Sequence, residues 1–182
     1  MDRIAEFLLE ACFLKQIPRS GYQFLRAGRE SVAEHVYCTT MIALVLSHLQ
    51  PETDVRRLLS MCMVHDLAET RTGDLNHVQQ HYLKTDESRA LSDALEGLSF
   101  GDAIVDLIDE FNAAETPEAQ LARDADQLAL IVDLKNLDEV GYTTPQTWLP
   151  EIVKRLRTKV GSDIARAILD ARGDSWWHKI FC

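Results

Sequence analysis

The stretch that decides the fold runs over residues 55–69 and reads VRRLLSMCMVHDLAE. This stretch predicts a helix with four residues on one face, at spacings of four, three and four: Leu58, Cys62, His65 and Glu69. Asp66 adjoins His65 and follows an apolar line of its own, Leu59 and Met63. Each unpaired buried polar group costs kilocalories, so a helix does not bury a His, an Asp and a Glu this close together without partners. We expect this helix to reach about Gly73 and to bring a polar centre into the core.

The helical period continues over nearly the whole chain on both sides of this stretch. Ser31-Val32-Ala33-Glu34 reads as a capping box that starts a helix ending at about Leu49. Thr116-Pro117 and Thr144-Pro145 each supply a capping hydroxyl followed by proline at the first helical position. Between residues 74 and 84 we expect a loop with at most a short helical piece. The other expected helices are one that ends before Pro18 and those over residues 86–98, 101–112, 117–140, 145–158 and 162–171.

The sequence shows no alternating apolar runs bounded by turn residues, no internal repeat and no low-complexity tract, so nothing predicts a β-sheet. A chain of 182 residues with 46% hydrophobic side chains, 8 Gly and 5 Pro is long enough for one sizeable core. The fold class that we expect is an all-α helical bundle, with residues 1–182 as a single domain.

The charge balance excludes several kinds of partner. The chain has 19 Lys and Arg against 29 Asp and Glu, which gives a formal net charge of −10. Nucleic acid and anionic membrane surfaces would repel such a chain, so we expect neither as a partner and expect a small-molecule substrate instead.

The sequence also predicts a cytoplasmic protein. We identify no apolar run close to the roughly 20 residues that span a bilayer, and Met1 is followed by Asp2 and Arg3 rather than by a signal peptide. No C-x-x-C spacing occurs among the cysteines, so neither a disulfide framework nor a thiolate zinc site is indicated. The four cysteines are Cys12, Cys38, Cys62 and Cys182.

Two further segments place polar residues on apolar helices. His35 shares a face with Cys38, Ile42 and Leu49, although a lone histidine on such a face is more often a hydrogen-bonded core residue than a ligand. Asp124 and Asp126 each align with apolar neighbours, so spacing leaves open which of the two points inward. Two imidazoles and two carboxylates on three helices suit a divalent transition metal with open positions for water and substrate. Such a metal makes hydroxide available near neutral pH.

The ordered pattern of His35, His65-Asp66 and Asp126 resembles the HD-domain superfamily of metal-dependent phosphohydrolases, which is all-helical. The fuller pattern resembles one branch, the small 5′-deoxynucleotidases and their HD-domain-containing relatives, and it covers the chain from about the first helix to Tyr142. The segments that carry this resemblance are Ile17-Pro18-Arg19-Ser20-Gly21-Tyr22, Glu30-Ser31-Val32-Ala33-Glu34-His35, Val64-His65-Asp66-Leu67-Ala68-Glu69, Gly73-Asp74 and Asp124-Ala125-Asp126.

The resemblance implies a role for each matching residue. It implies a single bound divalent transition metal, namely manganese, cobalt, iron, nickel, zinc or copper, held by His35, His65, Asp66 and Asp126. It favours Asp126 over Asp124, which becomes a structural neighbour. Glu69 and Asp74 match the acidic pair that orients the attacking water and transfers a proton, with Glu69 our first choice for the proton transfer. Arg19 matches the arginine that binds the substrate phosphate.

The implied reaction is hydrolysis of a nucleoside 5′-monophosphate to nucleoside and phosphate. Family members can use an aromatic residue close to the arginine to test the sugar, whereas here Ser20 and Gly21 follow Arg19. Tyr22 either reaches the sugar or packs in the core. Lys84 meets the phosphate or belongs to a solvated loop, and the same choice applies to His77 and His81.

Other readings compete with the nucleotidase. HD domains also hydrolyse dNTPs, the guanosine alarmone and cyclic dinucleotides. Thr70 after Glu69 argues against an alarmone hydrolase, and the absence of a Gly-Tyr-Pro element argues against a cyclic-dinucleotide enzyme. A catalytically silent nucleotide sensor would not need Glu69, Asp74 and Arg19. A helical interaction module with core histidines would bind no metal.

The end of the sequence carries an apolar cluster too short to form its own core, namely Trp176, Trp177, Ile180 and Phe181. This cluster closes the bundle or is buried against a second subunit, and the family resemblance favours a homodimer.

Overall fold

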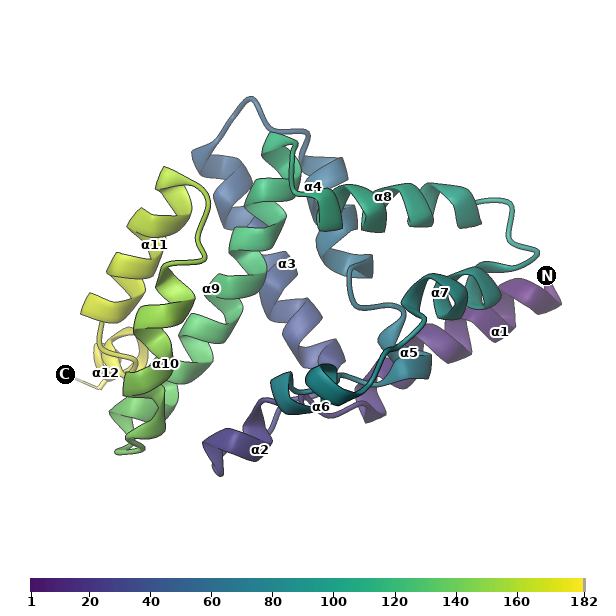
Figure 1. The fold of residues 1–182 in the computed structure, drawn as a ribbon. Coiled ribbons are helices and arrows are strands. Elements are labelled where there is room, and N and C mark those ends of the chain that lie inside the picture. Colours follow the sequence, from purple (N-terminus) through teal and green to yellow (C-terminus); the bar gives the residue numbers. More distant parts are fainter. Residues whose placement is uncertain (182) are drawn as a thin grey trace.

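The computed structural model describes residues 1–181, and its ordered elements are helical (Figure 1). This architecture confirms the predicted all-α class, and the only strand-like pairing within residues 1–181 is an isolated bridge between Pro18 and Ser31. In chain order the helices are α1 (Asp2–Ala11), the 3₁₀ helix η1 (Cys12–Gln16), α2 (Tyr22–Leu25), α3 (Val32–Leu49), α4 (Val55–Val64), α5 (Glu69–Thr72), α6 (His77–Tyr82), α7 (Glu87–Leu95), α8 (Gly101–Ala113), α9 (Pro117–Glu139), α10 (Thr144–Val153), α11 (Lys159–Asp170) and α12 (Ser175–His178).

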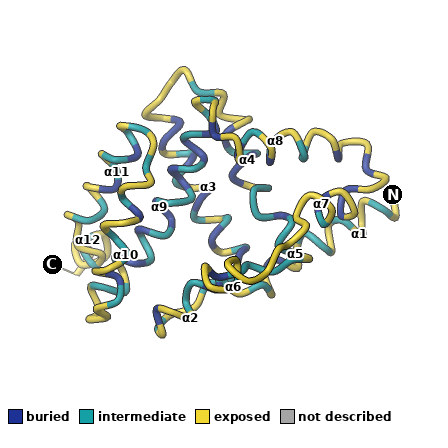
Figure 2. Tube along the Cα trace, viewed as in Figure 1, coloured by how far each residue is buried: buried dark blue, intermediate teal, exposed yellow. Residues whose placement is uncertain are grey.

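Three helices, α3, α4 and α9, pack against one another and form the centre of the molecule. Buried segments follow their inner faces, whereas α6 and the outer loops are exposed (Figure 2). Helices α10 and α11 cover one side of α9, and α8 packs beside α4 and α9. The main core contains, among others, Leu46, Leu58, Met61, Leu128, Ile131 and Leu134. Any polar side chain that points into this centre is therefore surrounded by apolar groups.

The expected start of α3 is confirmed in detail. Ser31 accepts a hydrogen bond from the backbone N–H of Glu34, and the Glu34 carboxylate accepts one from the N–H of Ser31, which makes a capping box. Thr116 caps α9 in the same way by accepting from the N–H of Ala119. Both caps fix the ends of helices that carry candidate site residues.

Helix α10 differs from the prediction at both ends. Thr144 is its first residue rather than its cap, and the helix ends at Val153 rather than near Thr158. Asp124 explains the early end, because its buried carboxylate accepts the N–H groups of Arg157 and Thr158 and the Thr158 hydroxyl. These bonds hold the connection after α10 against α9, and Thr158 then caps α11.

The helix expected from residue 55 to Gly73 is interrupted at the His-Asp pair. Helix α4 ends at Val64, residues 65–68 form turns, and α5 begins at Glu69. The His65 ring nitrogen Nδ1 lies 2.9 Å from the carbonyl of Cys62, which is the acceptor that the N–H of Asp66 would use in a continuing helix. The next bonds, Leu67 N–H to Val64 and Glu69 N–H to Asp66, close tighter i→i−3 turns. In these turns the side chains of His65 and Asp66 reach the same point, with His65 Nε2 and Asp66 Oδ2 3.2 Å apart.

Helix α3 has the length and composition of a membrane span, with a mean hydropathy of 1.3 over 18 residues, which the expectation of no such run overlooked. In the structure it is a central helix of the bundle. It contacts both α4 and α9 and buries His35, Thr39 and Ala43. Its high hydropathy therefore accompanies burial on the side that faces the other central helices.

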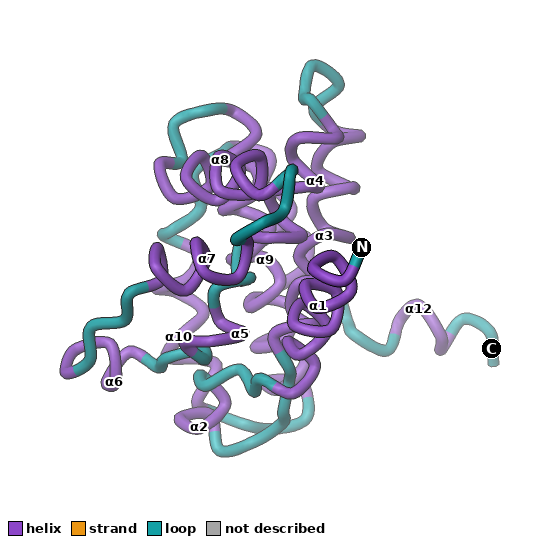
Figure 3. Tube along the Cα trace, turned by 90° about the vertical axis from the view of Figure 1, so that its right-hand side faces the viewer, coloured by secondary structure: helices purple, strands orange, loops and turns teal. Residues whose placement is uncertain are grey.

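The C-terminal cluster does not close the bundle. Trp176, Ile180 and Phe181 are each about three-quarters exposed, at 74%, 75% and 77%. Helix α12 extends away from the other helices (Figure 3). Cys182, the last predicted free thiol, lies outside the described residues, and the other three cysteines are free.

Candidate metal centre

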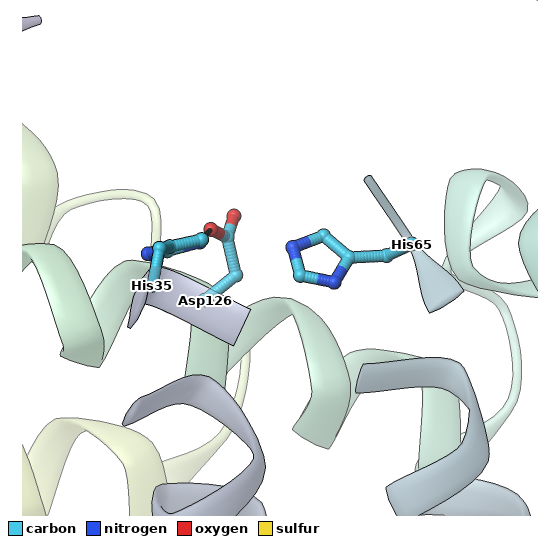
Figure 4. Close-up of side chains that lie close together, drawn as sticks. All are labelled: His35, His65 and Asp126. Atoms are coloured by element: carbon cyan, nitrogen blue, oxygen red, sulfur yellow. Dashed lines mark hydrogen bonds and ion pairs between the residues drawn. The ribbon is translucent and has the colours of Figure 1, made fainter. Parts of the chain in front are cut away.

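Three predicted ligands converge between the central helices. His35 comes from the first turn of α3, His65 from the end of α4 and Asp126 from the middle of α9 (Figure 4). One ligand atom from each lies within 4.8 Å of the others. His35 Nε2 and Asp126 Oδ1 are in hydrogen-bond contact at 3.0 Å, so both donor atoms lie at the same buried point. The arrangement supplies two nitrogen donors and one oxygen donor to a buried point.

The His65 ring is held in the tautomer that a metal requires. A carbonyl oxygen only accepts hydrogen bonds, so the Nδ1 that faces the Cys62 carbonyl carries the proton. When the ring is neutral, the Nε2 atom presents its lone pair to the centre, and it is buried without a hydrogen-bond partner among the described residues. A metal ligand whose other nitrogen donates to a backbone carbonyl is the usual arrangement at such sites.

Asp66 adds a fourth donor to the group. Its Oδ2 atom lies 3.2 Å from His65 Nε2 and 4.0 Å from His35 Nε2, and it is also buried without a hydrogen-bond partner. Buried polar atoms are nearly always paired, so two orphaned atoms side by side call for a further group between them. A divalent cation fits this donor set, because it satisfies a nitrogen lone pair and a carboxylate oxygen together.

The two aspartates of α9 face different surroundings. Gln127 Nε2 donates to Asp126 Oδ2 at 2.8 Å, which leaves Oδ1 directed at His35. Burial disfavours the charged form of Asp126, but the His35 hydrogen bond and the nearby histidine and Arg19 charges lower the pKa of its carboxyl overall. Asp124 points instead at the loop before α11, and a Cβ at Gly161 would come within 2.8 Å of its Cγ. The structure thus brings Asp126 to the centre and Asp124 to a loop.

Glu69 and Asp74 both lie beside the centre but are differently engaged. Glu69 Oε2 is buried without a hydrogen-bond partner, and burial, with the charges of Asp66 and Asp74, raises the pKa of Glu69 to about 9. Asp74 accepts the N–H of Ser20 at 3.0 Å and the Ser20 hydroxyl at 3.1 Å. Gly73 has a φ of +71°, a backbone conformation that favours glycine, and it turns the chain so that Asp74 meets this loop.

Arg19 lies between the candidate ligands and the solvent side of the site. Its Nη1 is 3.6 Å from both Asp66 Oδ2 and Asp74 Oδ2, and its Nε is 4.0 Å from Glu30. These separations exceed hydrogen-bond distances, so the guanidinium donors remain available to a ligand. The backbone is fixed, because Arg19 N–H donates to Glu30 and Val32 N–H donates to Ile17.

A network behind Arg19 went unnoticed in the sequence. The Tyr22 hydroxyl donates to Asp133 Oδ2 at 2.8 Å, which raises the pKa of Tyr22 in addition to the effect of burial. Burial, and then the Asp133 charge, raise the pKa of Glu30 to about 8, while Arg19 opposes this rise. Asp133 gave no motif, because a single aspartate on a long helix is usually a solvated residue.

A cavity of about 670 Å³ opens beside Arg19 and Asp74. Residues of α2, α6, α9 and α10 line it, including Tyr22, His77 and Trp148. Neither Lys84, on an exposed loop, nor His81, exposed on α6, lines it. Trp148 was missed by the sequence analysis, because an isolated aromatic residue in a helical pattern reads as core.

Comparison with known proteins gives consistent matches. The HD domain family matches residues 12–168. The 5′-deoxynucleotidase HDDC2 of Danio rerio is 27% identical over 147 residues, which cover 77% of this chain and 72% of the relative. The 5′-deoxynucleotidase hdd1 of Schizosaccharomyces pombe is 26% identical over 66% of this chain, and the match spans 65% of that relative, just under two thirds.

A solved structure shows the same fold at similar identity. The PH0347 protein of Pyrococcus horikoshii OT3 superimposes with a TM-score of 0.76 at 29% identity. The match covers 91% of this chain and 98% of that protein. The bundle is therefore similar to one found in a known protein over nearly its whole length.

We predict that Asp126→Asn weakens metal binding by more than about tenfold, because it removes a charged ligand oxygen from the centre. The measurement is the metal content of the purified protein and its affinity by titration. Asp124→Asn is the matched control two residues away, and it should keep the metal while lowering the free energy of unfolding. Equal metal content in the Asp126→Asn and wild-type proteins would contradict the site.

We predict that Glu30 makes the fold less stable as the pH rises. Because its folded-state pKa is raised to about 8 from 4.5, its contribution is fully present below 4.5 and is lost as pH rises through about 8. Glu30→Gln should therefore remove a loss on the order of 3–5 kcal/mol between pH 5 and pH 8.5, measured by urea unfolding. Glu34→Gln keeps the capping box and removes only the smallest of the charges that raise the pKa of Glu30, so most of that pH dependence should remain. An identical pH dependence in Glu30→Gln and wild type would show that Glu30 is charged in the fold.

Proposed function

This chain belongs to the HD-domain family, and on that premise we propose that it is a metal-dependent phosphohydrolase that cleaves deoxynucleoside 5′-monophosphates to nucleoside and phosphate. The observation that carries the proposal is the position of Arg19. Its unoccupied donors lie between the orphaned Asp66 oxygen and a cavity large enough for one nucleotide. The names of the curated relatives support the same substrate class.

The ligands that we propose for the metal are His35, His65, Asp66 and Asp126. Mixed nitrogen and carboxylate ligation suits a divalent transition metal, from manganese, iron, cobalt and nickel to copper and zinc. When bound, the ion supplies Lewis-acid activation of water and of a phosphoryl oxygen. The His65 tautomer and the Gln127 contact to Asp126 orient two of these ligands before any ion arrives.

Arg19 binds the substrate phosphate in this proposal. The planar guanidinium offers paired donors that match two phosphoryl oxygens. Asp74 positions it indirectly, because it fixes the adjacent Ser20 through two hydrogen bonds. The backbone hydrogen bond from Arg19 N–H to the Glu30 carbonyl fixes the other side of the same segment. The phosphate therefore meets a donor whose backbone is held on both sides.

Glu69 transfers the proton in this proposal. One of its carboxylate oxygens has no partner in the fold, whereas both oxygens of Asp74 are occupied by Ser20. Because its pKa is raised to about 9, the Glu69 carboxyl is protonated near neutral pH and can deliver this proton to the leaving 5′ oxygen, after which the carboxylate accepts the proton of the attacking water. Asp74 orients the phosphate-binding segment instead.

We further propose a homodimer in the cytoplasm. The exposed cluster on and after α12, Trp176, Trp177, Ile180 and Phe181, offers an apolar surface for a second copy of the chain. Three free cysteines agree with a reducing compartment.

The proposed function is tested by phosphate release from a panel of deoxynucleoside and ribonucleoside monophosphates, dNTPs and the guanosine alarmone. Metal-stripped protein is reconstituted separately with manganese, cobalt and zinc. We expect metal-dependent turnover of the deoxynucleoside monophosphates above every other class. Release only from dNTPs or the alarmone would assign another HD-domain reaction, and silence across the panel with metal bound would overturn catalysis.

The two acidic residues should fail in different ways. Glu69→Gln removes the proton carrier, so we expect kcat to fall by about 10²- to 10⁴-fold with the metal content unchanged. Asp74→Asn weakens the hold on the Arg19 segment, so we expect mainly a higher KM. Steady-state kinetics with a deoxynucleoside monophosphate measure both. If only Asp74→Asn lowered kcat, proton transfer would be assigned to Asp74 and the positioning role to Glu69.

A further inference from the structure

The cavity beside Arg19 has two chemically different parts. Arg19, Asp74 and Ser20 form a charged and polar part next to the candidate metal ligands. Apolar and aromatic side chains supply much of the remaining wall, namely Phe24 and Leu25 of α2, Val78 of α6, Leu130 of α9, and Trp148 and Ile152 of α10. A phosphate held by Arg19 leaves the rest of a ligand to fill this second part.

Trp148 is placed directly against the phosphate-binding segment. A Cβ at Gly21, two residues after Arg19, would lie 3.8 Å from Cζ3 and 4.0 Å from Cη2 of the Trp148 ring. The side chain is half-buried and packs beside the main core on one side while lining the cavity on the other. The indole is therefore both anchored and adjacent to the place where the phosphate binds.

The ring surface of Trp148 is not used by another aromatic group. Among residues 1–181 the aromatic contacts do not include Trp148 or Phe24, although both line the cavity. Phe24 is 40% exposed there. A flat aromatic ligand group can stack on such a surface, and every nucleobase has a flat face.

Tyr22, the other aromatic residue close to Arg19, is differently committed. Its hydroxyl donates to Asp133 at the back of the site, and its ring packs beside the main core. Its Cε1 atom would lie 2.9 Å from a Cβ at Gly28, so the ring is closely enclosed there. Trp148 is therefore the aromatic residue of this cavity best placed to meet a base.

We propose that Trp148 is a specificity-determining residue that stacks on the nucleobase of the substrate, while Arg19 holds its phosphate. The proposal rests on the proposed function, because it assigns the nucleoside part of that substrate to the apolar end of the cavity. It predicts that the base contributes to binding through α10, a helix that carries none of the candidate metal ligands or acidic residues. Removing the stack should weaken binding by about 5- to 150-fold, the range of one base–aromatic contact.

The first test compares ligands with and without a base on the metal-loaded protein. Deoxyadenosine and deoxyribose are titrated by calorimetry against the wild type, Trp148→Leu and Trp148→Phe, and neither ligand can be hydrolysed to phosphate. We expect Trp148→Leu to weaken deoxyadenosine binding by about 5- to 150-fold and Trp148→Phe to restore most of it. Deoxyribose binding should not change. Equal binding of deoxyadenosine by the wild type and Trp148→Leu would overturn the proposal.

The second test separates stacking from a structural role through turnover. With deoxyadenosine 5′-monophosphate, Trp148→Leu should raise KM by a similar factor, whereas turnover of deoxyribose 5-phosphate should match the wild type. Equal losses on both substrates would show that Trp148 only supports the fold, and the stacking assignment would fail. If neither phosphate ester is hydrolysed, the proposed function fails, and the deoxyadenosine titration still decides whether Trp148 binds a base.

Discussion

The structure depends on one constraint, the burial of an incomplete polar group between three apolar helices. His65 Nε2 and Asp66 Oδ2 face each other with no hydrogen-bond partner in the described residues, and His35 and Asp126 meet beside them. Leaving such atoms unpaired costs free energy that an apolar centre does not otherwise incur. A divalent cation at this point would satisfy these atoms, whereas the side chains that pack around it from α3, α4 and α9 do not.

The surroundings hold the site in place from outside the ligand set. Gln127 occupies the outer oxygen of Asp126, and the Cys62 carbonyl fixes the His65 tautomer. The Arg19 segment is bound on one side to Glu30 and on the other to Asp74. The Ser20–Asp74 contact joins parts of the chain 54 positions apart, whereas Gln127 and the Cys62 carbonyl act on close neighbours in the sequence. A change at any of these positions would displace a functional group without removing it.

The sequence predicted most of the helices and selected candidate ligands that the structure brings together, because both leave periodic or ordered patterns. Helix positions followed from apolar spacing, and His35 and His65-Asp66 stood out as polar groups on apolar faces. The break after Val64 left no trace, because the spacing of four, three and four continues through it while a ring nitrogen takes the backbone acceptor. Asp124 and Asp126 have equally apolar neighbours, and only the loop bonded to Asp124 distinguishes them. Trp148 contacts Gly21 across 127 positions of sequence, which no local pattern records.

Helix α9 has a mechanical consequence of its own. Residues two apart on a helix project about 200° apart, so Asp126 faces the metal ligands while Asp124 grips the connection that follows α10. One rigid rod thus sets the spacing between the Asp126 ligand and the helix that bears Trp148. Helix α9 therefore limits the length of a ligand that can reach both places. In the proposed complex, with the base on Trp148 and the reacting phosphorus beside Asp126, additional phosphates between the sugar and that phosphorus would exceed this spacing.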